Sequence, residues 1–86
     1  MTAREMFEKL GYKYHRTPQG IVCHKSYSVS YPCDEIIIYN NDFDFNNKEI
    51  RKTRIYLEKR TYINITLEEL QAINKQVEEL GWNNEI

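Results

Sequence analysis

Two copies of one short motif, at opposite ends of the chain, restrict what it can fold into. Thr2 and Glu5 near the start, and Thr66 and Glu69 near the end, have the Thr-x-x-Glu spacing of a helix capping box. In this motif each side chain satisfies a backbone N–H that the first helical turn leaves without a partner. The motif predicts a helix near each end and leaves the residues between for strands and turns.

Both terminal segments also have the apolar spacing of an amphipathic helix. In residues 2–10 the apolar side chains recur every three or four positions, and Gly11 follows as a helix stop. In the second segment, which Gly81 ends, the apolar side chains fall within an arc of about 140°. We expect this arc to be buried; its members are Leu67, Leu70, Ile73, Val77 and Leu80.

Short alternating segments between the helices predict strands. Residues 17–20 have proline at the second position and glycine at the fourth, which suits a tight turn between two strands. The isoleucine run at 36–38 is β-branched and predicts a central strand buried on both faces. Residues 53–57 and 61–65 predict a second hairpin. We expect one face of that hairpin to be buried, formed by Ile55, Leu57, Ile63 and Ile65. Phe43 and Phe45 suggest a further strand or an ordered edge.

The expected fold is α+β. It has an N-terminal helix, a mostly antiparallel sheet of about four to six strands, and a C-terminal helix, with both helices packed on one sheet face. Short connections favour antiparallel pairing, because parallel neighbours need long crossovers. The 86 residues form one domain, with 83–86 as a frayed tail. A core this thin leaves little room for an enclosed active site.

The net charge of −1 conceals blocks of alternating sign. The net charge is +3 in residues 1–33, −4 in 34–47, +4 in 48–60 and −4 in 66–86. Such alternation often reflects complementary faces within one fold or between two copies of it. It does not supply the overall basic field of a general nucleic-acid binder.

The sequence has neither a membrane-spanning segment nor a signal-peptide core, and this sets the expected location of the protein. No stretch approaches the roughly 18 apolar residues of a membrane span, so we expect no membrane partner. The first residues carry no apolar signal-peptide core. We therefore expect a cytoplasmic protein in which Cys23 and Cys33 are reduced thiols.

The two ends of the chain, TAREMFEKLGY at residues 2–12 and ITLEELQAINKQVEELGW at residues 65–82, together cover about a third of it. They resemble the ends of small proteins encoded by phages and prophages of Gram-positive bacteria. That family has no assigned activity. The resemblance therefore implies a phage or prophage setting in a bacterial cytosol, and it supplies no site residues.

The candidates for a metal or catalytic site are cysteines, histidines and carboxylates. Structural zinc sites draw ligand pairs from Cys-x2–4-Cys or His-x3–5-His spacings, which this chain lacks. A cysteine nucleophile needs a base within hydrogen-bond reach, and no local signature indicates one. The acidic segment at 42–46 lacks the glycine of a calcium-binding loop. We predict no metal, no cofactor and no catalytic residue among these candidates, which are His15, Cys23, His24, Cys33, Asp34, Glu35, Asp42 and Asp44.

The remaining hypotheses are two kinds of binding module. Our first hypothesis is a non-enzymatic protein–protein interaction module that binds a host or phage protein, or a second copy of itself. An exposed sheet face or edge strand would supply the site. Tyrosines cover contact area at low entropic cost, and the candidates are Tyr12, Tyr14, Tyr56 and Tyr62.

The alternative hypothesis is a nucleic-acid-binding module built on the hairpin region 48–62. There basic groups would hold phosphates while tyrosine rings stack on bases. The candidate residues are Lys48, Arg51, Lys52, Arg54, Lys59 and Arg60.

Overall fold

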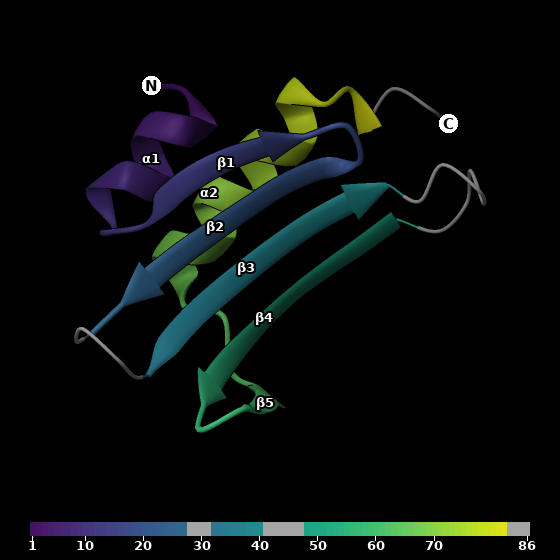
Figure 1. Cartoon of the computed structure of the whole chain (residues 1–86). Helices are drawn as coiled ribbons and strands as arrows, with labels where there is room; N and C mark the ends of the chain where they lie inside the picture. Colours follow the sequence, from purple (N-terminus) through teal and green to yellow (C-terminus); the bar gives the residue numbers. More distant parts are fainter. Residues whose placement is uncertain (28–31, 41–47, 83–86) are drawn as a thin grey trace.

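The described part of the chain is a five-stranded antiparallel sheet with both helices against one of its faces (Figure 1). A computed structural model describes residues 1–27, 32–40 and 48–82. This arrangement confirms the α+β fold expected from the sequence. In chain order the elements are α1 (Ala3–Lys9), β1 (Lys13–Thr17), β2 (Gly20–Ser26), β3 (Cys33–Asn40), β4 (Lys48–Tyr56), β5 (Lys59–Tyr62) and α2 (Leu67–Glu79).

The sheet is a meander in which each strand pairs with the next one along the chain. Its order is β1-β2-β3-β4-β5, and every pair is antiparallel. The predicted turn at 17–20 joins β1 to β2. Gly20 is required at its end, because a Cβ there would lie 2.0 Å from the carbonyl oxygen of Ile38.

Both helices begin at the predicted capping boxes. The hydroxyl of Thr2 accepts from the backbone N–H of Glu5 at 3.2 Å, and that of Thr66 accepts from Glu69 at 3.1 Å. In each box the glutamate side chain returns a bond to the backbone N–H of the threonine. The capping motif therefore located both helix starts correctly.

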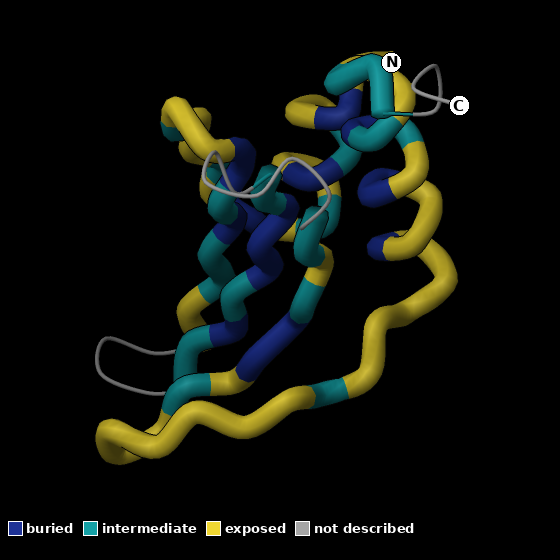
Figure 2. The backbone as a smooth tube through the Cα atoms, turned by 90° about the vertical axis from the view of Figure 1, so that its right-hand side faces the viewer, coloured by how far each residue is buried: buried dark blue, intermediate teal, exposed yellow. Residues whose placement is uncertain are grey.

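The core lies between the helices and one sheet face (Figure 2). Ile36 and Ile38 are fully buried on this face, and Ile37, which alternation places on the opposite face, is only 6% exposed. The isoleucine run is thus a central strand buried on both faces, as predicted. The core residues are Ala3, Phe7, Tyr12, Ile21, Cys23, Ile36, Ile38, Ala72 and Ile73.

The second hairpin differs from its predicted form. β4 and β5 leave only Leu57 and Glu58 as the turn, with φ values of 49° and 65°. Positive φ at both positions is typical of a type I′ turn, which matches the twist of the flanking strands. The expected buried face was therefore wrong at two of its four positions: Ile55 and Ile63 are half-buried, whereas Leu57 and Ile65 are exposed.

Three of the predictions lie outside the described residues. They are the strand at Phe43 and Phe45, the carboxylates Asp42 and Asp44, and the tail at 83–86. Within the described residues, no helix has the length and apolar character needed to span a bilayer.

Candidate interaction surface

Helix α2 presents apolar side chains to solvent near its start. Leu67 is 67% exposed and Leu70 is 44% exposed, although both belong to the arc expected to be buried. That expectation was wrong for these two residues. The residues that α2 buries are Glu69, Ala72, Ile73 and Gln76. Since two of these are polar, the helix is rotated relative to its apolar periodicity.

Glu69 explains the rotation, because its carboxylate is the centre of a buried network. It accepts from Lys52 Nζ at 2.7 Å, from the Tyr12 hydroxyl, and from the Thr66 backbone N–H at 2.9 Å. The side chains of Glu69 and Lys52 are only 6% and 7% exposed. Burial raises the pKa of Glu69, but the hydrogen bonds from Lys52, Thr66 and Tyr12 outweigh burial and hold that pKa below its ordinary value. The carboxylate therefore stays charged inside the protein.

Two further polar contacts hold α2 in the same orientation. The Tyr14 hydroxyl donates to Gln76 Oε1 at 2.6 Å, and the backbone N–H of Ala3 donates to the Glu79 carboxylate at 2.7 Å. A buried polar group that loses its partner costs about 1–3 kcal/mol. Rotation of α2 to bury its leucines would break these contacts, so the polar side chains determine which helix face is covered.

The helix geometry then directs both leucines outward. At about 100° per residue, Leu70 lies roughly 100° from Glu69 around the helix axis, and Leu67 lies roughly 160° away. Ile73 lies only about 40° from Glu69 and is 2% exposed. The apolar side chains of one helix are thus divided between the core and solvent.

The exposed leucines belong to a longer exposed stretch. Figure 2 shows exposed backbone running from the β4–β5 hairpin along the base of the molecule to the start of α2. Nine large apolar side chains are exposed in the described residues, and six of them fall within residues 56–70. The six are close in sequence but do not share one face, because Tyr56 pairs with Lys59 and Tyr62 with Thr53, which puts the two rings on opposite faces of the hairpin. We call these six the basal surface: Tyr56, Leu57, Tyr62, Ile65, Leu67 and Leu70.

The four predicted tyrosines divide between the interior and the basal surface. Tyr12 is 3% exposed and Tyr14 is half-buried, and the hydroxyls of both bind α2. Burial, together with the Glu69 carboxylate, raises the pKa of Tyr12 far above its ordinary value. Tyr56 and Tyr62 are 54% and 77% exposed. The structure therefore places only the second pair where a partner can reach it.

The six predicted basic residues do not form one surface. Alternation along β4 and β5 divides them between the two sheet faces. Arg54 donates to the buried Asp34 carboxylate at 2.8 and 3.2 Å. Burial raises the pKa of Asp34, but bonds from Arg54 and Tyr27 outweigh it and keep the pKa low. The other contacts are Lys52 to Glu69, Arg60 to Glu35 at 2.6 Å, Arg51 to Glu49 at 2.7 Å and Lys48 over the Trp82 ring at 5.5 Å.

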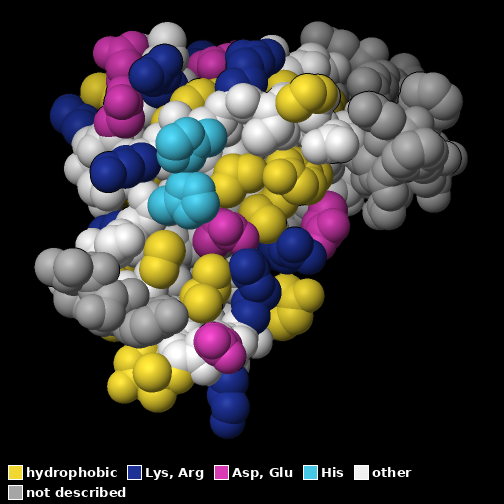
Figure 3. All heavy atoms as spheres, viewed as in Figure 1, with side chains coloured by type: hydrophobic (Ala, Val, Ile, Leu, Met, Phe, Trp, Pro, Cys, Tyr) yellow, Lys and Arg dark blue, Asp and Glu magenta, His cyan; other side chains and the backbone are white. Residues whose placement is uncertain are grey.

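The sheet face opposite the helices carries both histidines beside apolar side chains (Figure 3). The rings of His15 and His24 lie 5.1 Å apart, and His24 Nδ1 is 3.8 Å from the Glu35 carboxylate. Cys33 belongs to this face, whereas Cys23 lies in the core, where burial raises its pKa to about 12. Within residues 1–27, 32–40 and 48–82, no group of three or more His, Cys, Asp or Glu is placed to hold a metal ion.

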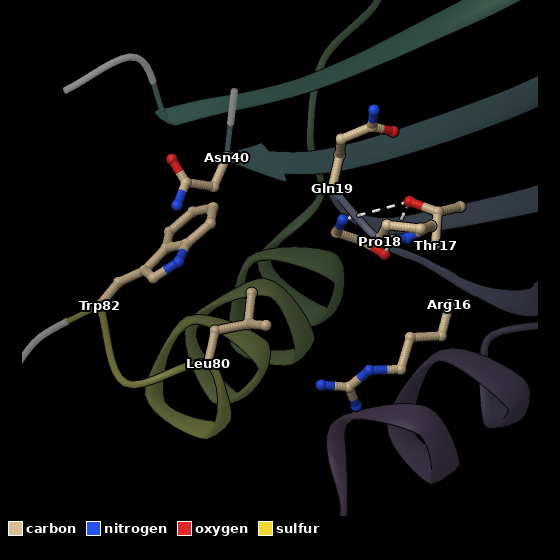
Figure 4. A pocket seen from close by; sticks show the side chains of 8 residues that line it. Arg16, Thr17, Pro18, Gln19, Asn40, Leu80 and Trp82 are labelled. Carbon is tan, nitrogen blue, oxygen red and sulfur yellow. Dashed lines mark hydrogen bonds between the residues drawn. The ribbon is translucent and has the colours of Figure 1, made fainter. Parts of the chain in front are cut away.

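A polar pocket of about 280 Å³ lies at the other end of the sheet from the hairpin. Figure 4 shows Trp82 and Asn40 on one side of it and the β1–β2 turn on the other, with Leu80 between them. Arg16 reaches towards it from β1. The pocket is smaller than the roughly 300–1,000 Å³ of typical ligand sites. We assign it no ligand.

Four members of the basal surface were not among the predicted site residues: Leu57, Ile65, Leu67 and Leu70. The sequence of α2 does contain a signal for which face is buried. Glu69 and Gln76 share a helical arc with Ala72 and Ile73, and this arc is the one that faces the core. Comparison of this chain with family models, curated proteins and solved structures gave no match. The assignment of the basal surface therefore depends on its geometry.

Proposed function

We propose that this chain is a non-enzymatic protein–protein interaction module whose binding site is the basal surface. The observation that carries the proposal is the concentration of six exposed large apolar side chains within residues 56–70. Exposed apolar side chains gathered in one region, next to the exposed edge strand β5, are typical of a contact region. The proposed setting, in line with the resemblance of the chain ends, is the cytosol of a bacterium that carries a phage or prophage.

The magnitudes limit how tightly this surface can bind. Full burial of a large apolar side chain contributes about 1.5–3 kcal/mol, and these six are 38–77% exposed, so together they contribute roughly 5–10 kcal/mol as an upper bound. Association costs about 4–15 kcal/mol in lost translational and rotational freedom. The surface can therefore supply at most a weak affinity by apolar burial alone. Because the buried Lys52–Glu69 pair fixes α2 in advance, Leu67 and Leu70 require little ordering when a partner binds.

Photo-crosslinking tests this proposal at the level of single residues. Benzoylphenylalanine at Leu67 or Leu70 should cross-link a protein in a lysate of the cells that naturally produce the chain. The same group at Lys13, exposed on β1, is the control and should give no product. Excess wild type should suppress the cross-link, and a folded Leu67→Glu/Leu70→Glu variant should not. Equal yields at Lys13, or suppression by the charged variant, would refute the basal surface as the site.

The nucleic-acid alternative has less geometric support, because its basic residues are divided between two faces and most bind carboxylates. Lys59 is the informative position for a test. Reversing the charge of Lys52 or Arg54 would also break a structural ion pair, whereas Lys59 is exposed. The alternative expects a gel shift that weakens with added salt and falls in Lys59→Glu. No shift at low salt with DNA or RNA would exclude it.

A further inference from the structure

We propose that a second copy of this chain docks on the edge of the sheet, with β5 of one copy pairing antiparallel with β5 of the other. This inference rests on the proposed function, because it names a partner for the basal surface. β5 is the last strand of an open sheet, and all four of its residues are exposed. An exposed edge strand offers a row of main-chain groups to another strand.

The pairing of β5 with β4 shows which groups this edge offers. The N–H of Ile63 donates to the Lys52 carbonyl oxygen at 3.1 Å, so the main chain at Ile63 points towards β4. Hydrogen-bonded positions alternate along an antiparallel strand, so Thr61 also points towards β4. Arg60 and Tyr62 direct their N–H and C=O groups the other way. On that side the described residues provide no further strand.

One register suits both the backbone and the side chains. If the two-fold axis passes at Thr61, Arg60 lies opposite Tyr62 of the second copy, and both present outward main-chain groups. Each such pair closes hydrogen bonds and sets a guanidinium beside an exposed ring. Leu57 and Glu58 turn the chain back to β4, so the pairing covers β5 itself, and the exposed ring of Tyr62 is the part of the basal surface that it would bury. A register centred on Arg60 is disfavoured, since it sets two guanidinium groups directly opposite.

The basic residues of β5 are the argument against this pairing, because lysine and arginine commonly protect edge strands. The charge of Arg60 is already balanced within its own copy. Its guanidinium donates to Glu35 at 2.6 Å and to Thr53 at 3.0 Å. Its neighbour Tyr62, at 77%, is the most exposed of the nine exposed large apolar side chains. The edge therefore offers a ring, free main-chain groups and one exposed cation, Lys59, which in this register lies opposite Ile63 of the second copy rather than opposite another cation.

The size of the contact sets the expected strength. β5 supplies four residues from each copy, far fewer than the roughly 20–30 a side of a standard interface. We therefore expect a weak, reversible dimer with a Kd on the order of 100 μM or above. It should be visible as a concentration-dependent mass in sedimentation experiments.

Cysteine cross-linking tests the register. In a Cys33→Ser background, Thr61→Cys places two thiols directly opposite, at a Cα separation of about 4.5–5.5 Å that a disulfide can bridge. Lys59→Cys is the matched control, since its two copies would lie four residues apart, about 13 Å along the strand. With copper phenanthroline as oxidant, the Thr61→Cys chain should dimerise at least about tenfold faster than the control. Equal rates would overturn the proposed pairing.

A proline variant separates this inference from the proposed function. Tyr62→Pro removes one outward N–H and leaves the β4 pairing intact, and Tyr62→Val removes the ring but keeps that N–H. Sedimentation should show loss of the dimer for proline and only weakening for valine. A wild type that is monomeric at all concentrations overturns the second copy as partner. If the Leu67 cross-link to another protein persists in that case, the proposed function stands without it.

Discussion

The region around β2 and β3 and the region from the β4–β5 hairpin to the start of α2 have similar apolar sequence patterns and opposite outcomes. In the first, Ile21, Ile36 and Ile38 are completely buried beneath the helices. In the second, all four residues of β5 are exposed, as are Ile65 and Leu67. The difference teaches that alternation identifies a strand, whereas the elements packed above it decide whether its apolar side chains are buried.

Polar contacts of α2 determine which of its side chains are buried and which are exposed. The buried Lys52–Glu69 pair and the Tyr14–Gln76 bond hold α2 with one polar stripe inward. Replacing such a pair by apolar side chains is often neutral for stability, so a buried pair by itself is weak evidence of a stabilising role. Its consequence here is geometric, since it sets the rotation of α2 and with it the exposure of Leu67 and Leu70.

Breaking the buried pair should have the largest effect. Lys52→Ala leaves Glu69 charged and without its cation in the interior, which typically costs 3–5 kcal/mol in the free energy of unfolding. Urea denaturation followed by circular dichroism measures it. Lys59→Ala, at an exposed position, is the control and should stay within about 0.5 kcal/mol of wild type. The double variant Lys52→Met/Glu69→Gln should recover part of the loss, because glutamine keeps the helix cap. A loss below about 1 kcal/mol for Lys52→Ala would contradict the structural role of the pair.

The two faces of α2 offer a matched comparison of apolar truncations. Ile73→Ala removes a side chain that is 2% exposed and should cost about 2–5 kcal/mol. Leu67→Ala, at a side chain 67% exposed, should change stability by less than about 0.5 kcal/mol. The Leu67 change should instead weaken binding of the partner. Equal costs for the two substitutions, measured by urea denaturation, would show that α2 is rotated in solution relative to this structure.

Much of the fold was predictable because local rules and tertiary packing agree in most of the chain. The capping boxes at Thr2 and Thr66 located both helices, since their geometry depends on residues three apart in sequence. The turn ending at Gly20 and the isoleucine run were likewise recognised from nearest neighbours. Each of these signals is local, so it survives without knowledge of the rest of the fold.

The basal surface was not predictable, because its exposure depends on contacts between distant residues. Leu67 and Leu70 have ideal spacing for a buried stripe, and only the pairing of Glu69 with Lys52, seventeen residues away, turns them outward. Leu57 was expected in a strand because nothing in the sequence around it resembles a usual type I′ turn, which favours asparagine and glycine. Of the predicted tyrosines, the two that remain exposed are those in this same region.

Acid should weaken the buried network before it affects the apolar core. The pKa values of Glu69 and Asp34 lie below their ordinary values of 4.5 and 3.8. Both carboxyls are more acidic folded than unfolded, so their contribution to stability is complete above about pH 5 and is lost as the pH falls through their folded pKa values. Urea midpoints between pH 7 and pH 3 measure the decline. Glu69→Gln should flatten that profile, and an unchanged slope would show that Glu69 does not contribute to it.

The β4–β5 turn gives the smallest effect and separates stability from binding. Leu57 and Glu58 both hold positive φ, where a side chain costs about 1 kcal/mol relative to residues suited to it. Leu57→Asn/Glu58→Gly should therefore raise the free energy of unfolding by about 1 kcal/mol. It should also weaken partner binding, because it removes Leu57 from the basal surface. Glu58→Gly alone is the control, since it relieves strain and keeps Leu57, so it should stabilise the protein without weakening binding. If both variants bind the partner as wild type does, Leu57 is exposed because the turn places it there, and Leu57 does not belong to the binding site.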